Sequence, residues 1–209
     1  MHGLSSILSR ILFPPRTSFL SKMVKKVENS PETRLIWFDG EMTGLELDKV
    51  LVEVACVITE ADLTKVADFG PIVIHQNEET LEKMNPWCKR TFKKNGLLEL
   101  IKESQYSEET VDNMLKEFLN KNTPENKCPL AGNSVGMDRM FINKYLPQTA
   151  GHIHYRTVDV STIKELCRRW HPDIYEKAPD KKMNHRSLDD VYESIDELKY
   201  YRQSLFLPC

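Results

Sequence analysis

The sequence has no apolar run long enough to cross a membrane, and its five cysteines show no Cys-x-x-Cys spacing. A membrane-spanning helix needs about 20 consecutive apolar residues, so we expect no membrane among the partners of this chain. Without paired cysteines, neither a zinc knuckle nor a disulfide framework is indicated. We expect reduced thiols, several of them filling the core. Internal repeats are absent too, and 209 residues that are 40% hydrophobic suffice for one sizeable core.

An excess of positive charge is also missing. The whole chain carries a formal net charge of −2, and without the five basic residues among the first 27 it has 24 Lys and Arg against 31 Asp and Glu, or −7. Proteins that grip long nucleic acids neutralise many phosphates and are usually basic. If the substrate is a nucleic acid, this charge favours very short oligonucleotides.

The first 27 residues contain no Asp or Glu but several Lys, Arg and Ser residues. An amphipathic stripe runs through this segment, formed by Leu4, Ile7, Leu8, Ile11 and Leu12. Pro14 and Pro15 end it. This pattern is typical of a mitochondrial transit peptide, with a basic disordered tail as the alternative. We therefore expect residues 1–27 to target the mitochondrial matrix and residues 28–209 to form a single domain.

Met23 offers an internal start, which would give a form without the targeting segment in the cytoplasm or nucleus.

Apolar patterning predicts an α/β fold with a mixed five-stranded sheet flanked by helices. Three early strands are followed by helices and strands in alternation. The expected strands lie near residues 34–40, 50–59, 66–75, 129–133 and 155–159. The expected helices lie within 79–103, in pieces, and over 107–120, 136–146, 160–170 and 187–205.

Four acids and one histidine stand out from this framework. Asp39 and Glu41 follow the apolar run 35–38, and the two-residue period of a strand puts both on one face. Asp138 ends a second block, Gly132–Asp138, and in a third block His185 precedes Asp190 by five residues. Neighbouring carboxylates repel each other and are costly to desolvate, and a divalent cation removes that problem. Hard cations such as Mg²⁺ or Mn²⁺ prefer oxygen ligands.

Each block also has a local alternative. Asp39 and Glu41 could be an exposed acidic strand end. Asp138 could be a first-turn acid of a helix capped by Ser134. The segment 187–190 resembles a capping box, with Ser187 at the cap. The order and spacing of the blocks together favour one catalytic site.

These blocks resemble the DEDDh exonucleases, and within them the oligoribonuclease family. Trp37–Leu45 is similar to that family's W-x-D-x-E-M-T-G-L motif. The other similar segments, within a resemblance spanning about residues 34–206, are Cys128–Val135, His154–Arg156, Asp159–Thr162, Lys164–Leu166 and His185–Asp190. The resemblance implies a ribonuclease H-like fold.

The resemblance also implies a mechanism. Two Mg²⁺ or Mn²⁺ ions would be held at the 3′-terminal phosphodiester by Asp39, Glu41, Asp138 and Asp190. His185 would take the proton from the attacking water. The products would be 5′-mononucleotides from dinucleotides and slightly longer RNA, with DNA possible as a substrate.

The resemblance further assigns residues to substrate binding in a homodimer. Leu45 and Trp87 would pack on the bases, and Ser134 and Ser161 would contact the 5′ phosphate. Tyr155 and Arg156 would arrive from the other subunit. Alternatively, Leu45 and Trp87 could be core residues, and the segment 154–156 an ordinary strand edge.

The sequence departs from the family pattern at three places. Gly40 stands where a bulkier apolar residue is usual, and Gly136–Met137 replaces a His-Glu pair before Asp138. Phe92 stands where the family has a histidine that helps to cap the 5′ phosphate. The third change bears on the preference for dinucleotides.

Two other functions stay open at this level. One is a DEDDh exonuclease acting on DNA or on longer single strands, and the other is a non-catalytic nucleic-acid-binding module. The acidic charge and the Tyr155–Arg156 pair disfavour the first, and the presence of all five catalytic side chains disfavours the second.

Overall fold

The computed structural model describes residues 28–46, 48–181 and 185–206. The expected transit peptide (residues 1–27), with its amphipathic stripe and Met23, lies outside the described residues.

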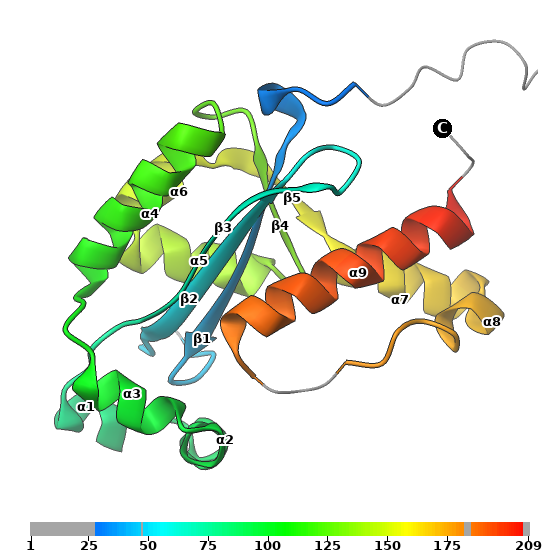
Figure 1. Cartoon of the computed structure of the whole chain (residues 1–209). Helices are drawn as coiled ribbons and strands as arrows, with labels where there is room; N and C mark the ends of the chain where they lie inside the picture. The colour runs from blue at the N-terminus through cyan, green and yellow to red at the C-terminus, as the bar shows by residue number, and fades with distance from the viewer. Residues whose placement is uncertain (1–27, 47, 182–184, 207–209) are drawn as a thin grey trace, which may run out of the picture.

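The centre of the fold is a five-stranded mixed sheet of order β3-β2-β1-β4-β5 (Figure 1). Strand β1 pairs antiparallel with β2 and parallel with β4, β2 pairs antiparallel with β3, and β4 pairs parallel with β5. The strands are β1 Leu35–Met42, β2 Leu51–Thr59, β3 Lys65–Val73, β4 Pro129–Gly132 and β5 His154–Asp159. The expected mixed sheet is confirmed.

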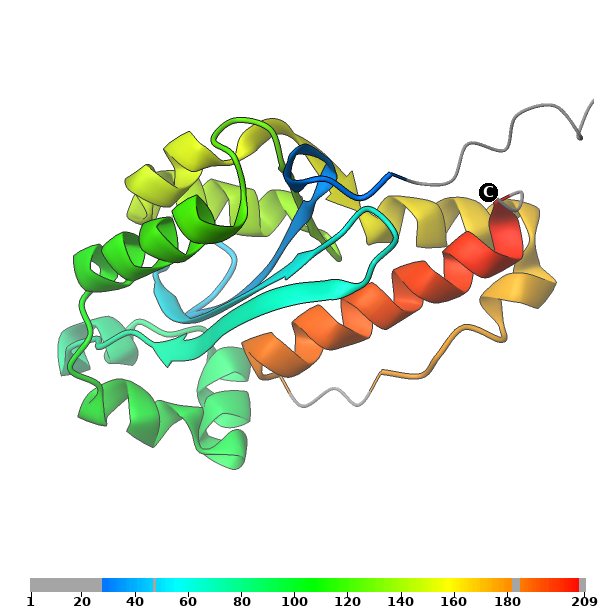
Figure 2. The same ribbon diagram turned by 45° about the horizontal axis from the view of Figure 1, so that its top comes forward.

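Helices cover both faces of the sheet (Figures 1 and 2). One face carries α4 Glu108–Asn122, α5 Gly136–Tyr145 and α6 Pro147–His152, and the other carries α7 Val160–Trp170, α8 Pro172–Tyr175 and α9 Ser187–Leu205. The remaining helical segments are η1 Pro31–Thr33, α1 Glu78–Glu82, α2 Pro86–Asn95 and α3 Leu97–Glu103. The sequence did not predict η1, α6 and α8, which are short.

Burial explains why β1 and β2 read as continuous apolar runs. Every residue of β2 is buried, so its side chains alternate between two hydrophobic cores. The first core joins β1 and β2 to α4 and α5, and the second joins them to α7 and α9. A third cluster, around Phe92 and Leu97, packs α1, α2 and α3 near the Val52 end of β2. This third cluster lies near the end of β1, because Met42 of β1 pairs with Leu51 of β2.

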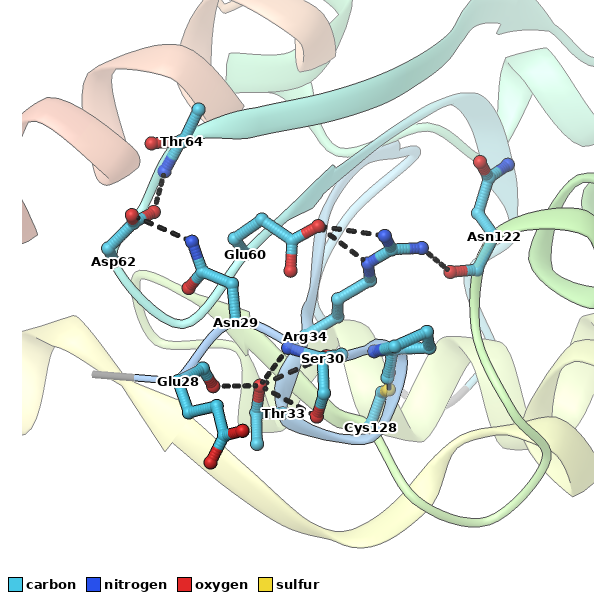
Figure 3. Close-up of polar contacts among 11 residues, drawn as sticks. Glu28, Asn29, Ser30, Thr33, Arg34, Glu60, Asp62, Thr64, Asn122 and Cys128 are labelled. Atoms are coloured by element: carbon cyan, nitrogen blue, oxygen red, sulfur yellow. Dashed lines mark hydrogen bonds and ion pairs between the residues drawn. The ribbon is translucent and has the colours of Figure 1, made fainter. Parts of the chain in front are cut away.

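The first described residues are tied to the sheet by polar contacts, drawn in Figure 3. The Arg34 guanidinium donates to Glu60 Oε1 at 2.7 Å and to the Asn122 carbonyl at 2.7 Å. The Asn29 amide donates to Asp62 Oδ2 at 2.8 Å. These contacts join Asn29 and Arg34 to the segment that follows β2 and to the end of α4.

Two further observations concern features that the sequence lacks. The described cysteines, Cys56, Cys88, Cys128 and Cys167, are free thiols, and all four are buried. Among the described residues, no helix combines the length and apolarity that a membrane crossing demands.

Candidate active site

A cleft of about 510 Å³ opens at the end of β1, a volume within the usual range for ligand sites. Strand β1, the loop that follows it, the start of α2, and the segment leading into α9 form its walls. The lining residues are Asp39, Gly40, Glu41, Met42, Gly44, Leu45, Glu46, Asn85, Trp87, Cys88, His185 and Asp190. Leu45 and Trp87 are 65% and 49% exposed there, so the alternative that they are core residues is wrong.

The four acids come from three elements, and all of them except Asp138 line the cleft. Asp39 and Glu41 lie two residues apart in β1, as the strand period requires. Asp138 lies in the first turn of α5, where its Oδ1 accepts the Gly40 N–H at 3.0 Å. Asp190 lies in the first turn of α9 and lines the cleft. The partial positive charge at a helix start favours an acid in both helical positions.

Burial raises the pKa of all four carboxyls, and neighbouring negative charges add to the rise. Burial is the largest cause in each, and it raises the pKa of Asp39 well above its usual range, with Asp138, Glu41 and Asp190 adding repulsion. Burial and then the charge of Asp190 raise the pKa of Glu41 to about 8. The pKa of buried Asp138 rises to about 7, and that of Asp190 rises as well. Such a cluster favours bound cations or protons at neutral pH.

Among the described residues, one group has the spacing of a metal site. Glu41, His185 and Asp190 each offer a ligand atom, and these atoms lie within 4.8 Å of one another. Asp39 and Asp138 adjoin this group. The charge of Glu41 raises the pKa of Asp39, and the charge of Asp138 raises the pKa of both. Oxygen atoms dominate the set, which suits a hard divalent cation.

His185 is held in an unusual backbone conformation at the entry to α9. Its φ is 50°, in the left-handed region that non-glycine residues seldom adopt. The Asn95 side-chain amide donates to the His185 carbonyl at 2.9 Å. The Trp87 ring meets the His185 ring edge-on, with 5.0 Å between centroids. Asn95 was not predicted from the sequence, because nothing in its local pattern points to residue 185.

The capping-box alternative for the segment 187–190 is wrong. The N-cap of α9 is Arg186, and Ser187 is already helical. The Ser187 hydroxyl donates instead to Glu53 Oε1 at 2.9 Å. Glu53 was missed by the sequence analysis, although a single acid inside the apolar run 50–58 was a signal.

Ser134 does not cap α5 either. The N-cap of that helix is Val135, without a side-chain bond, and Ser134 has a φ of 52°. The Ser134 N–H donates to Asp159 Oδ1 and to Ser161 Oγ, both at 2.9 Å, and the two serine hydroxyls are 3.1 Å apart. Ser134 and Ser161 thus form one polar cluster at the ends of β4 and β5, outside the residues that line the cleft.

Tyr155 and Arg156 lie on β5, an edge strand, and do not line the cleft of their own chain. Tyr155 is 74% exposed, and the Arg156 guanidinium lies 5.4 Å from the centre of its ring. Their placement agrees both with a strand edge and with contacts to a second molecule.

Two of the departures from the family pattern have a structural account. A side chain at Gly40 would point away from the acids, and its Cβ would meet Leu51 Cδ2 at 3.0 Å. Phe92 is fully buried in the cluster formed by α1, α2 and α3, and does not line the cleft. Nothing in the structure explains Gly136–Met137.

Comparison with known proteins gives a consistent result. The family model described as Exonuclease (RNase T) matches residues 36–198. The mitochondrial oligoribonucleases of Bos taurus and Homo sapiens are each 47% identical over 174 residues, which is 83% of this chain and 73% of theirs. The oligoribonuclease of Bordetella pertussis is 50% identical over 175 residues, covering 83% of this chain and 96% of its own.

Solved structures give the fold. A structure of exonuclease I has a TM-score of 0.65 at 14% identity, over 82% of this chain and 41% of that chain. Exonuclease I from Methylocaldum szegediense has a TM-score of 0.63 at 15% identity, again spanning 82% of this chain and 41% of the other. The ribonuclease H-like fold is therefore confirmed, and this chain belongs to the oligoribonuclease family and is a 3′-to-5′ exoribonuclease.

Proposed function

We propose that this exoribonuclease acts on dinucleotides and slightly longer RNA, through two divalent ions held by Asp39, Glu41, Asp138 and Asp190. The observation that carries this proposal is a group of four carboxyls with raised pKa at the end of β1. Three of them line the cleft, and Asp138 accepts the N–H of Gly40 in the cleft wall. When bound, Mg²⁺ or Mn²⁺ stabilises the attacking and leaving oxygens of an in-line displacement.

The side chains of the cleft supply the remaining chemistry. His185 accepts the proton of the attacking water, since its ring lies beside the acids. The four carboxylates hold the terminal phosphodiester indirectly, through the cations that they bind. Leu45 and Trp87 pack on the bases, and their exposed side chains on the cleft wall support this role. Base stacking on an aromatic ring contributes about 1–3 kcal/mol per base.

The charge of the chain supports a short substrate. Without its first 27 residues the chain has a net charge of −7, which offers little long-range attraction to phosphates. The Phe92 side chain is buried, so a 5′ phosphate is held by other residues. We assign that contact to Ser134 and Ser161, which lie hydroxyl to hydroxyl.

Substrate length and metal dependence can be tested together. Residues 23–209 should hydrolyse RNA dinucleotides faster than decanucleotides, should require Mg²⁺ or Mn²⁺, and should stop in EDTA. Asp190→Asn should lower kcat by on the order of 10²-fold or more, the scale of losing one electrostatic stabiliser. The measurement is the release of mononucleotide from RNA and DNA ladders.

Asp189→Asn is the matched control, because Asp189 shares the first turn of α9 but is exposed and does not line the cleft. Its rate should stay near wild type. Equal rates for Asp190→Asn and wild type at saturating Mg²⁺ would contradict the metal assignment, and equal rates on all lengths would contradict the short substrate.

The raised pKa values predict how the metal-free protein responds to pH. The pKa of Glu41 rises from 4.5 to about 8 on folding, so the folded state binds more protons than the unfolded chain between these values. Stability should therefore fall as pH rises from about 5 to 8, with each unit of pKa shift contributing about 1.4 kcal/mol. The thermal midpoint in EDTA should be higher at pH 6 than at pH 8.

Saturating Mn²⁺ should remove this fall, because a cation stabilises the ionised carboxyls. Glu41→Gln has no titrating group at this position, so its midpoint in EDTA should depend less on pH. A wild-type midpoint that rises between pH 6 and pH 8, or a Glu41→Gln slope equal to that of wild type, would refute the role of this carboxyl.

We also propose a homodimer in which Tyr155 and Arg156 complete the site of the neighbouring subunit. Both are exposed on an edge strand and lie outside their own cleft. A mixture of Tyr155→Ala and Asp39→Asn subunits should regain about one working site per mixed dimer. Either variant alone should be poor. Dinucleotide hydrolysis after mixing measures this, and a mixture no faster than its parts rules out the shared site.

We propose that residues 1–27 direct the chain to mitochondria and that residues 28–209 form the exonuclease domain. The bovine and human relatives are mitochondrial oligoribonucleases, and the exonuclease family model matches residues 36–198, within the second segment. A reporter fused to residues 1–27 should enter mitochondria, and replacing Leu8 and Ile11 with Asp should block its import. Cytosolic residence of the unaltered fusion would refute the targeting role.

A further inference from the structure

We propose that Glu53 is a positioning residue for His185, acting through Arg186 and Ser187. This inference rests on the proposed role of His185 as the general base. Glu53 does not line the cleft and takes no part in the chemistry described above.

Glu53 is fully buried near the start of the apolar strand β2. Its Oε1 accepts the Ser187 N–H at 3.0 Å and the Ser187 hydroxyl at 2.9 Å. Its Oε2 lies 2.9 Å from Nη2 of Arg186. A buried carboxylate is tolerated when it is paired and hydrogen-bonded in this way. The one side chain thus binds the two residues that follow His185.

The location of Glu53 disfavours the ionised form of Glu41 in the cleft. In the β1–β2 register, Glu53 lies directly opposite Glu41. Like charges directly across a sheet destabilise it, and the charge of Glu53 adds to the repulsion felt by Glu41. A carboxylate opposite Glu41 does not stabilise the pairing of β1 with β2. Its contacts instead run to residues 134 and 133 positions away in the sequence.

The position of His185 depends on hydrogen bonds to its neighbours more than the position of helix α9 does. Helix α9 is held along its length by the buried side chains of Val191, Ile195, Leu198 and Tyr201. His185 precedes that helix, in the left-handed conformation, and is itself only half-buried.

The two anchors of His185 come from two different elements, α2 and β2. The Asn95 amide of α2 holds the His185 carbonyl, and Glu53 of β2 holds the following two residues. Figure 1 shows the start of α9 beside the ends of β1 and β2, with α2 below it. Loss of Glu53 should therefore displace His185 while leaving Asp190, within the packed helix, in place.

The test combines Glu53→Gln with His185→Ala. Glu53→Gln keeps the size of the side chain but removes the charge that pairs with Arg186. It should lower kcat about 10- to 100-fold, the usual effect of losing a residue that orients a ligand or base, with KM little changed. His185→Ala should lower kcat by about 10²–10⁴-fold. Adding Glu53→Gln to His185→Ala should then cost less than twofold, because the two residues act as a unit.

Glu60→Gln is the matched control. Glu60 follows the other end of β2 and pairs with Arg34 at 2.7 Å, far from the cleft. Its kcat should equal that of wild type. If Glu53→Gln fails to fold, Arg186→Gln replaces it, since the same ion pair is removed from the more exposed partner.

The outcomes separate the two proposals. Normal kcat in Glu53→Gln and in Arg186→Gln, with a slow His185→Ala, overturns the positioning role alone. An equal loss from Glu53→Gln in wild-type and His185→Ala backgrounds overturns it as well, because the effect then bypasses His185. A His185→Ala enzyme with the wild-type kcat overturns the role of His185 as base, and the positioning role with it.

Discussion

The partial or complete burial of four neighbouring carboxyls is the constraint on which this structure depends. Asp39 and Glu41 are fixed by the pleat of β1, and their side chains cannot turn away without breaking a central strand. Asp138 and Asp190 are brought to the same place by the first turns of two helices on opposite faces of the sheet. Close packing on both faces holds the acids together, since burial is the largest cause of every raised pKa in the cluster.

The stability of the fold therefore comes from elsewhere. Two large hydrophobic cores lie on the two faces of β1 and β2, and neither needs the acids in order to form. A protein whose packing is independent of its site can keep that site destabilised until cations bind. Variants that remove a charge from the site are then expected to gain stability and to lose activity. This is the stability–activity trade-off found at other catalytic centres.

The sequence predicted the parts of this structure that depend on local pattern. Alternating and continuous apolar runs gave all five strands, and helical periodicity gave the longer helices. The same-face placement of Asp39 and Glu41 follows from strand geometry alone. Helices α6 and α8, of six and four residues, are too short to show a period.

Long-range contacts could not be predicted. Ser187 is in a typical cap position by sequence, yet Glu53, 134 residues away, takes its hydroxyl. Ser134 is likewise drawn to Ser161 and Asp159 rather than to its own helix. In both cases the serine bonds to a distant partner, and another residue, Arg186 or Val135, stands at the N-cap. A serine near a helix start is thus weak evidence for capping where acids lie nearby, because its O–H or N–H can donate to them.

The residues of the cleft divide by their exposure in a way that bears on its evolution. The acids lie on a strand and on helix starts packed by the cores, whereas Leu45 and Trp87 are exposed on the cleft wall. Exposed side chains can change without disturbing either core, so substrate length can vary at little cost to folding. The acids lack this freedom, because each is bound to the backbone of a packed element. Gly40 shows how tight the packing is, since even one added carbon would lie 3.0 Å from Leu51. Changes in substrate preference within this fold should therefore accumulate on the cleft walls, while the chemistry at the end of β1 stays fixed.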